Sequence, residues 1–99
     1  MRRTPVFLSE TAQRILRHLH PHLPNLKRSV RKALDDLAGD PFMGKPLQDE
    51  LAGLWSLAVA RYRLIYQVNE RDIAVVFLGP RRTVYERLRE ILTEQRGTD

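Results

Sequence analysis

The feature that most constrains this fold is a change in the spacing of apolar residues near position 54. Before it, apolar side chains recur at intervals of three and four residues, which is typical of helices that bury one face. After it come three segments rich in Val, Ile, Leu and Tyr, at residues 54–59, 61–68 and 73–78. Only short connections separate these segments, which predicts consecutive antiparallel strands. The chain is therefore predicted to combine helices with a small, antiparallel-rich β-sheet.

A strand and two helices are predicted ahead of these segments. Residues 5–8 have the composition of a short strand, and Ser9 after them is a suitable helix N-cap. The first helix should end near His20, because two prolines follow and proline interrupts a helix. A second helix places its apolar face along residues 26–37 and should stop at the Gly-Asp-Pro sequence that comes next.

A loop and a last helix complete the predicted fold. Residues 40–53 contain two Pro and two Gly, which predicts a loop. Thr83 and Glu86 have the spacing of a capping box, and a helix should follow over the apolar stripe that begins at Val84. The order β-α-α-β-β-β-α defines an α+β fold with two N-terminal helices packed on one face of the sheet and a C-terminal helix. A chain of 99 residues has room for one such domain, residues 1–99.

The short turns also predict which side chains share a face of the sheet. If Val59 pairs with Tyr62 and Val68 with Ile73, then Arg63 lies opposite Ala58 in one neighbouring strand and Leu78 in the other. The bulkier face then holds Trp55, Leu57, Val59, Tyr62, Leu64, Tyr66, Val68, Ile73, Val75 and Phe77. The smaller face holds Ser56, Ala58, Arg63, Ile65, Gln67, Ala74, Val76 and Leu78. We expect helices to cover the first face and the second to be open to a ligand.

The charge of the chain favours a polyanionic partner. Lys and Arg number 17 against 12 Asp and Glu, for a net charge of +5, and 14 of the 17 are Arg. The first 34 residues hold eight basic residues and one acidic residue. The guanidinium fork of Arg matches the geometry of phosphate, so nucleic acid is the first candidate. The alternative is that the charge serves only solubility.

One candidate site combines Arg63, Arg81, Arg82 and Tyr85. Arg63 lies within a strand, where a charge is costly unless it faces water or a partner. Arg81 and Arg82 follow the end of the neighbouring strand and precede a helix, whose free N–H groups favour an anion. Tyr85 could stack on a base. The alternative interpretation is a solvated Arg63 paired to Glu86 or Glu70, beside a packed tyrosine.

Two further clusters have simpler alternatives. Lys27, Arg28, Arg31 and Lys32 share one face of the second helix and could bind a nucleic-acid backbone, or could form only a solvated face. The histidines of residues 18–22 are interrupted by a proline and have no nearby Cys or carboxylate, so we expect surface loop and no metal site. There is no Cys, no apolar run of about 20 residues and no signal-peptide pattern, so we expect a cytoplasmic location.

The order and spacing of several motifs resemble a known family. They are Gly44-Lys45-Pro46-Leu47, Glu50-Leu51, Gly53-Leu54-Trp55, Tyr62-Arg63-Leu64-Ile65-Tyr66 and Gly79-Pro80-Arg81-Arg82-Thr83-Val84-Tyr85. Together with Val6-Phe7-Leu8-Ser9-Glu10, they resemble the RelE/ParE toxin superfamily of bacterial type II toxin–antitoxin systems over roughly residues 5–92. The spacing from Arg81 to Tyr85 is similar to that of the RelE-like branch.

The resemblance implies a function and roles for individual residues. RelE-like members are ribosome-dependent mRNA endoribonucleases, in which the 2′-hydroxyl of the messenger attacks the adjacent phosphate in the ribosomal A site. Arg63 and Arg81 would then stabilise the transition state, and Tyr85 would stack on the base or assist proton transfer. Arg82 and Arg61, with the basic face of the second helix, would bind RNA.

The resemblance also implies a partner and leaves alternatives open. The partner would be a cognate antitoxin, and no metal or organic cofactor is implied. Ser56 and Ala58 stand where many nucleolytic members have Lys or Arg, and Pro80 stands where many have His. The alternatives are a ParE-like inhibitor of DNA gyrase and a translation inhibitor that binds without cleaving.

Overall fold

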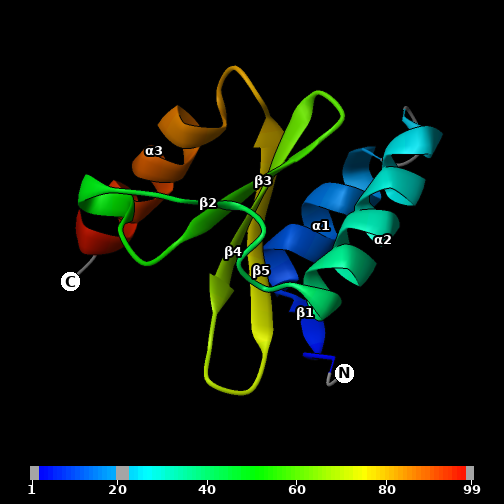
Figure 1. The fold of residues 1–99 in the computed structure, drawn as a ribbon. Helices are drawn as coiled ribbons and strands as arrows, with labels where there is room; N and C mark the ends of the chain where they lie inside the picture. Colours follow the sequence, from blue (N-terminus) through cyan, green and yellow to red (C-terminus); the bar gives the residue numbers. More distant parts are fainter. Residues whose placement is uncertain (1–2, 20–22, 98–99) are drawn as a thin grey trace.

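The computed structural model describes residues 3–19 and 23–97, which fold around one five-stranded sheet (Figure 1). The strands are β1 (Val6–Leu8), β2 (Lys45–Pro46), β3 (Trp55–Val59), β4 (Tyr62–Val68) and β5 (Ile73–Pro80). The helices are α1 (Glu10–Leu19), α2 (Pro24–Gly39) and α3 (Val84–Gly97), with a short 3₁₀ helix, η1, at Asp49–Leu51. Helices α1 and α2 lie on one side of the sheet and α3 on the other (Figure 1).

The strand order is β1-β5-β4-β3-β2, with β1 parallel to β5 and the other pairs antiparallel. This confirms the predicted α+β fold and the predicted order of the main elements. The prediction of a continuous loop over residues 40–53 was wrong, because this segment contains η1 and the edge strand β2. Proline is tolerated at a sheet edge, so Pro46 does not prevent β2 from pairing with β3.

Local signals account for the ends of the helices. The Oγ of Ser9 accepts a hydrogen bond from the Ala12 N–H at 3.1 Å, which confirms Ser9 as the N-cap of α1. Helix α1 ends at Leu19, and His20 lies outside the described residues. Helix α2 begins at Pro24, a residue suited to a first helical turn because its missing N–H would have no partner there. Helix α3 begins directly after Thr83, as predicted.

The bulkier sheet face forms the main core, as predicted. Buried side chains of α2, among them Val30 and Leu37, pack against Leu64, Tyr66 and Ile73 of the central strands. Ala12 of α1 joins the same cluster. Burial of this apolar surface supplies the driving force that holds the helical pair on the sheet.

A register shift in β5 changes the prediction for the other half of that strand. Val68 pairs with Ile73 as predicted, but beyond Tyr66 the pairing shifts so that Ile65 lies opposite Phe77. Such an extra residue is a β-bulge, and it reverses which face each following side chain occupies. Phe77 therefore packs on the α3 side and Leu78 on the α1/α2 side, the reverse of the prediction. Arg63 lies opposite Gly79 and not opposite Leu78.

The second sheet face is open only in part. Helix α3 covers its centre, where Val84 and Leu88 pack on Ile65 and Phe77, and Ile65 is 0% exposed. The prediction that this face is open was therefore wrong at its centre, because large apolar side chains occur on both faces and both need cover. The uncovered part lies toward the β3–β4 turn, where Ala58 is exposed and Arg63 half-buried.

A buried phenol holds β2 beside β3. Tyr66 is 0% exposed, and its hydroxyl donates to the Pro41 carbonyl at 3.0 Å and accepts from the Gly44 N–H at 3.1 Å. A Cβ on Gly44 would lie 2.6 Å from this hydroxyl and 2.7 Å from the Ser56 carbonyl, so only glycine fits there. Burial raises the pKa of Tyr66, although the Gly44 N–H opposes this effect. The hydroxyl thus ties the segment before β2 to the centre of the sheet.

We expect Tyr66→Phe to lower the free energy of unfolding by about 1–3 kcal/mol, because it leaves the Gly44 N–H and the Pro41 carbonyl without this partner. Urea unfolding followed by circular dichroism measures the change. Tyr62→Phe is the matched control, since Tyr62 is only half-buried and none of the described residues hydrogen-bonds its hydroxyl. Equal effects of the two substitutions would contradict the anchoring role.

The raised pKa of Tyr66 also predicts how stability depends on pH. An unfolded tyrosine ionises near pH 10, before the folded one, so ionisation favours the unfolded chain above about pH 10. The contribution is fully present below that pH and is lost as the pH rises toward the folded pKa. Comparing unfolding curves at pH 8 and about pH 10.5 should show a steeper loss in the wild type than in Tyr66→Phe. Parallel losses would contradict the assignment.

Candidate functional site

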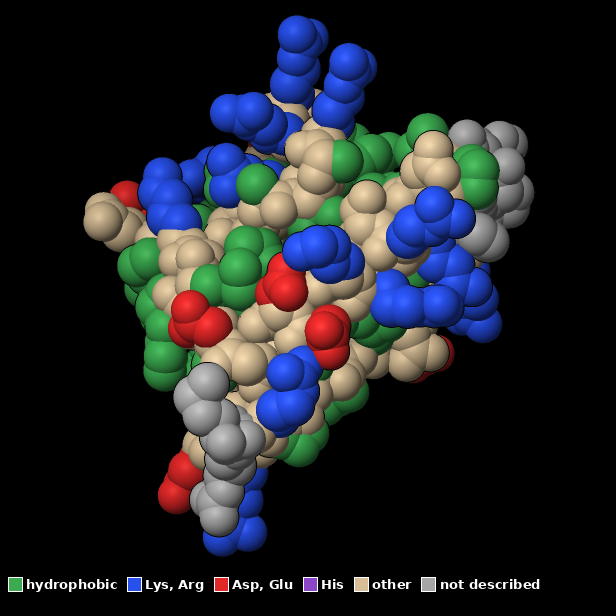
Figure 2. Space-filling model, turned by 45° about the vertical axis from the view of Figure 1, so that its right-hand side comes forward, with side chains coloured by type: hydrophobic (Ala, Val, Ile, Leu, Met, Phe, Trp, Pro, Cys, Tyr) green, Lys and Arg blue, Asp and Glu red, His purple; other side chains and the backbone are tan. Residues whose placement is uncertain are grey.

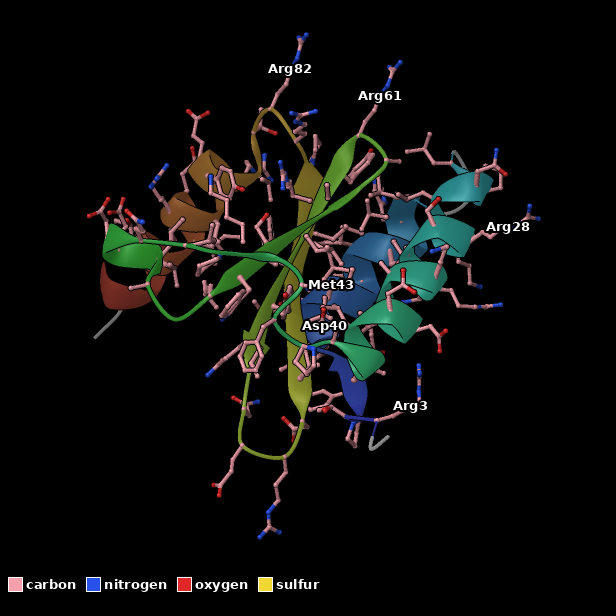
Figure 3. All side chains as sticks on the ribbon, viewed as in Figure 1. Arg3, Arg28, Asp40, Met43, Arg61 and Arg82 are labelled. Carbon is pink, nitrogen blue, oxygen red and sulfur yellow. The ribbon has the colours of Figure 1, made fainter. Side chains whose placement is uncertain are left out.

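Several arginines gather at one end of the sheet, where the β3–β4 turn meets the end of β5. The Arg81 N–H donates to the Arg61 carbonyl at 2.9 Å, which joins the two segments. Ala60 begins the two-residue turn with a φ of 55°, as a tight hairpin requires. The side chains of Arg61 and Arg82 extend from this end into solvent (Figure 3). Arg81 and Arg82 thus follow the end of β5 beside the β3–β4 turn, the end of the sheet at which Arg63 was predicted to have them as neighbours.

Arg63 lies on the α3 side of the sheet, one residue pair in from this end. It pairs with Ala58 on β3 and with Gly79 on β5, and it alternates with the inward residues Leu64 and Tyr62. Among the described residues no carboxylate forms an ion pair with it, so the alternative pairing with Glu86 or Glu70 does not occur. On the β3 side, its neighbour Ala58 contributes only a methyl group and is exposed.

Tyr85 lies on the same side of the sheet as Arg63. A Cβ on Gly79 would approach Val84 Cγ2 to 3.1 Å, so the absence of one lets the start of α3 pack closely. The next residue, Tyr85, then donates a hydrogen bond from its hydroxyl to Ser56 Oγ at 3.0 Å. Ser56 is 1% exposed, so the bond fixes the tip of the half-buried tyrosine against the sheet.

A cavity of about 280 Å³ opens beside Tyr85, between β2, η1 and α3. Lys45 and Arg89 contribute its basic side chains, and Gln48 and Asp49 also line it. Arg89 Nε lies 2.6 Å from Glu50 Oε1, so this guanidinium is already paired. Sequence reasoning missed Lys45 as a site residue because the segment around it was predicted to be a loop. The signal that pointed to Lys45 was its place in the motif Gly44-Lys45-Pro46-Leu47, which resembles the RelE/ParE superfamily.

The basic face of α2 does not join this site. Lys27, Arg28, Arg31 and Lys32 belong to a helix that packs on the other side of the sheet, and Arg28 points away from the sheet (Figure 3). Figure 2 brings this helical side forward and shows Asp and Glu side chains among the Lys and Arg side chains. The structure therefore separates the predicted RNA-binding residues into two surfaces.

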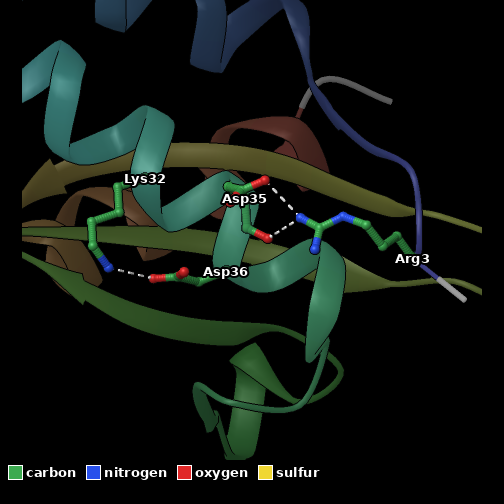
Figure 4. A network of polar contacts seen from close by, with 4 residues as sticks. All are labelled: Arg3, Lys32, Asp35 and Asp36. Carbon is green, nitrogen blue, oxygen red and sulfur yellow. Dashed lines mark hydrogen bonds and ion pairs between the residues drawn. The ribbon is translucent and has the colours of Figure 1, made fainter. Parts of the chain in front are cut away.

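Acidic partners also reduce the charge of that helical surface. Lys32 Nζ lies 3.0 Å from Asp36 Oδ2, one helical turn away (Figure 4). Arg3 bridges to Asp35 at 2.6 Å and so ties the chain before β1 to α2. Both pairs are exposed and each contributes less than about 1 kcal/mol to stability.

The histidine motif forms no metal site in the part of the chain that the structure covers. His18 is exposed in the last turn of α1, whereas His20 and His22 lie outside the described residues. Across residues 3–19 and 23–97, no three His, Cys, Asp or Glu side chains gather as metal ligands would. None of the helices in these ranges is long and apolar enough to cross a membrane.

Comparison with known proteins identifies the class. Residues 6–85 match the family described as ParE toxin of type II toxin–antitoxin system, parDE. The chain is 39% identical over 74 residues to Toxin RelG of Mycobacterium tuberculosis (strain ATCC 25618 / H37Rv), a match that covers 74% of this chain and 83% of RelG. The chain thus belongs to the ParE toxin family, within the RelE/ParE superfamily, and is a toxin of the type II toxin–antitoxin class.

Solved structures agree with this assignment. The toxin–antitoxin complex RelBE2 of Mycobacterium tuberculosis contains a chain with a TM-score of 0.70 and 33% identity, covering 82% of this chain and 94% of that one. The YoeB/ParE toxin of Agrobacterium tumefaciens has a TM-score of 0.66 at 16% identity, covering 77% of this chain and 96% of that one. At that identity, the second likeness shows the shared fold alone.

We expect the hydrogen bond between Tyr85 and Ser56 to appear as a coupling of about 0.5–1.5 kcal/mol in a double-mutant cycle. The variants are Ser56→Ala, Tyr85→Phe and the double substitution, and urea unfolding gives their free energies. Each single substitution removes the same bond, so the double variant should lose less than the sum of the two. Strictly additive losses would show that the bond does not hold Tyr85 in place.

Proposed function

We propose that this toxin is a ribosome-dependent mRNA endoribonuclease that inhibits translation. The observation that carries the proposal is the grouping of Arg63 with Arg61, Arg81 and Arg82 at one end of the sheet, with Tyr85 on the same face as Arg63. An uncompensated guanidinium beside a fixed aromatic ring suits a phosphodiester whose neighbouring base can stack. The 39% identity to RelG, a protein named as a toxin of the Rel type, favours this branch.

The proposed reaction uses the messenger's own nucleophile. The 2′-oxygen forms a bond to the adjacent phosphorus, and the bond from phosphorus to the 5′-oxygen breaks. The 2′-hydroxyl gives its proton to solvent water, and the leaving 5′-oxygen takes one from solvent, so the products are a 2′,3′-cyclic phosphate and a 5′-hydroxyl. Arg63 and Arg81 act by neutralising the added negative charge of the transition state. Tyr85, held at its hydroxyl by Ser56, acts mainly as a stacking surface that positions the base.

The remaining basic residues fit different contacts. Arg61 and Arg82 extend beyond the sheet (Figure 3), and we propose that they hold RNA beside the cut. Lys27, Arg28, Arg31 and Lys32 lie on the opposite layer, so they would contact an RNA backbone elsewhere on the ribosome and not the reacting phosphate. Removing any of them should weaken binding without changing the chemical step.

An antitoxin is the proposed protein partner. The related RelBE2 structure is a toxin–antitoxin complex, and this chain carries eight basic residues and one acidic residue in its first 34. An antitoxin with an acidic segment would be attracted to this basic region on the α1/α2 side, and a second segment would be needed to cover the arginine-rich end of the sheet. Since mRNA and ribosomes are cytoplasmic, we propose the cytoplasm as the place of action.

A second candidate is inhibition of DNA gyrase. It is favoured by the match of residues 6–85 to the ParE toxin family. Under this proposal, the same arginines would contact a protein or DNA surface, and mRNA would stay intact. The two candidates therefore differ in which nucleic acid is broken in the cell.

We expect Arg63→Ala and Arg81→Ala to relieve growth arrest when the toxin is expressed without an antitoxin. Each substitution removes one positive charge that stabilises the transition state, so cleavage on programmed ribosomes should slow on the order of 100-fold. Primer extension on translated mRNA measures the cuts. Arg71→Ala, in the exposed β4–β5 turn at the other end of the sheet, is the control and should stay toxic. Circular dichroism checks that each variant is folded.

The same assay separates the candidate functions. Cuts inside codons that need active translation support the endoribonuclease. Intact messages accompanied by gyrase-linked DNA breaks would replace it with the gyrase inhibitor. Full toxicity of both folded arginine variants would show that the arginine-rich end is not the active surface.

A further inference from the structure

Lys45 is a basic residue that the proposed reaction has not yet used. It lies on the edge strand β2, where its backbone pairs with Ser56 of β3. Residues paired in this way place their side chains on the same face of a sheet, so Lys45 projects on the side that carries Ser56. It is exposed and lines the cavity beside Tyr85. No carboxylate in the described ranges forms an ion pair with it.

The register places Lys45 and Arg63 on the same face of the sheet, two strands apart. Lys45, Ser56 and Ile65 form a row across three strands, and Arg63 lies two residues before Ile65. Strand spacing and rise per residue put the Cα atoms of Lys45 and Arg63 about 12 Å apart. A lysine and an arginine side chain can each span about half of that distance, so their charges can meet at one phosphate.

On the sheet itself, β3 contributes only small side chains between these two residues. Ala58 is exposed and has only a methyl group, and Ser56 is buried and accepts the hydrogen bond from Tyr85. No bulky side chain of β3 therefore stands between the two cations on this face. The Tyr85 hydroxyl reaches Ser56 from α3, so the tip of this ring lies between the two basic residues.

Cleavage of a phosphodiester is favoured by positive charge on more than one side of the phosphate. The transition state spreads extra negative charge over oxygens that point in different directions, and Arg63 and Arg81 approach from the turn end only. An ammonium group on the opposite side would complete the neutralisation without needing bidentate geometry. Arg89 is less suited to this role because Glu50 already pairs with it.

We infer that Lys45 contacts the phosphodiester at the cut and supplies positive charge from the β2 side, opposite Arg63. This inference rests on the proposed nuclease function and adds Lys45, on the two-residue strand β2, to the residues that contact the substrate. Lys45 is thereby assigned as a substrate-contacting residue, in a chain whose adjacent strand β3 presents only Ser56 and Ala58 to the same space.

The binding test uses a short single-stranded RNA that cannot be cut because its 2′-hydroxyls are methylated. Proton–nitrogen correlation spectra follow its titration into the wild type, Lys45→Gln, Lys45→Arg and Arg71→Gln. We expect Lys45→Gln to raise Kd roughly tenfold, as for loss of one charge-assisted contact. Its slope of log Kd against log salt should fall by about 0.7, the value for one phosphate on a single strand.

The two other variants are matched controls. Lys45→Arg keeps the charge and should stay within about threefold of the wild type, which a purely steric role would not allow. Arg71→Gln removes one positive charge at the far end of the sheet and should leave both Kd and the local shifts at the cavity unchanged. An unchanged Kd and salt slope in Lys45→Gln would overturn the inference, as would an absence of RNA binding by the wild type.

Cleavage on programmed ribosomes, measured in parallel, tells this failure apart from failure of the proposed function. If the wild type cuts and Lys45→Gln cuts equally fast, the Lys45 assignment is wrong and the nuclease stands. If the wild type binds RNA through Lys45 but cuts no message, the nuclease proposal fails and the phosphate contact stands. We expect Lys45→Gln to cut at least about tenfold more slowly at saturating toxin.

Discussion

The extra residue in β5 is the constraint on which the rest of this molecule depends. Val75 pairs with Tyr66 and Phe77 pairs with Ile65, so Val76 has no partner of its own. From that point the strand presents Phe77 to α3 and places Gly79 opposite Arg63. An unshifted strand would put Leu78 beside Arg63 and crowd the end of the sheet where the arginines gather. The bulge thus allows a core on both faces and an open basic end.

The site is assembled from elements that are distant in sequence. Arg63 comes from the central strand, Tyr85 from the first turn of α3 and Lys45 from the edge strand. Gly79 lets the start of α3, which carries Tyr85, pack closely, and Ser56 accepts the hydrogen bond from Tyr85. Gly44 fits beside Tyr66 directly before Lys45. These contacts fix Tyr85 and the start of β2 on the face of the sheet that also carries Arg63. Among the described residues, neither Arg63 nor Lys45 forms an ion pair, so both charges can attract a polyanion.

Much of the fold was predictable because it follows from local signals. The two-residue turn at Ala60 set the pairing of Val59 with Tyr62, and Ser9 marked the start of α1. The bulge at Val76 was not predictable, because an alternating apolar strand looks the same with or without an extra residue. Strand β2 was missed because a pair of residues that includes proline carries almost no strand signal.

The parts of the candidate site that follow from the order of the strands were predictable. The parts that depend on which face of the sheet a helix covers were not. Arg63, Arg81 and Arg82 follow from adjacent strand ends. Helical periodicity places Lys27 and Arg28 on one side of α2 but does not say which face of the sheet α2 covers, so their separation from Arg63 was not visible. Lys45 could be assigned to the site only once the pairing of β2 with β3 was known, and that pairing joins segments about ten residues apart in the chain.

The tether formed by the Tyr66 hydroxyl has a consequence for genetics. It anchors the residues just before Lys45. A substitution of the buried Tyr66 would therefore displace Lys45 on the surface, because β2 joins the two. Survivors of a selection against this toxin should therefore carry changes at Tyr66 or Gly44 as well as at the arginines. A map of inactivating mutations would then reach well beyond the residues that meet the target, and attenuated alleles could be made without altering any contact to it.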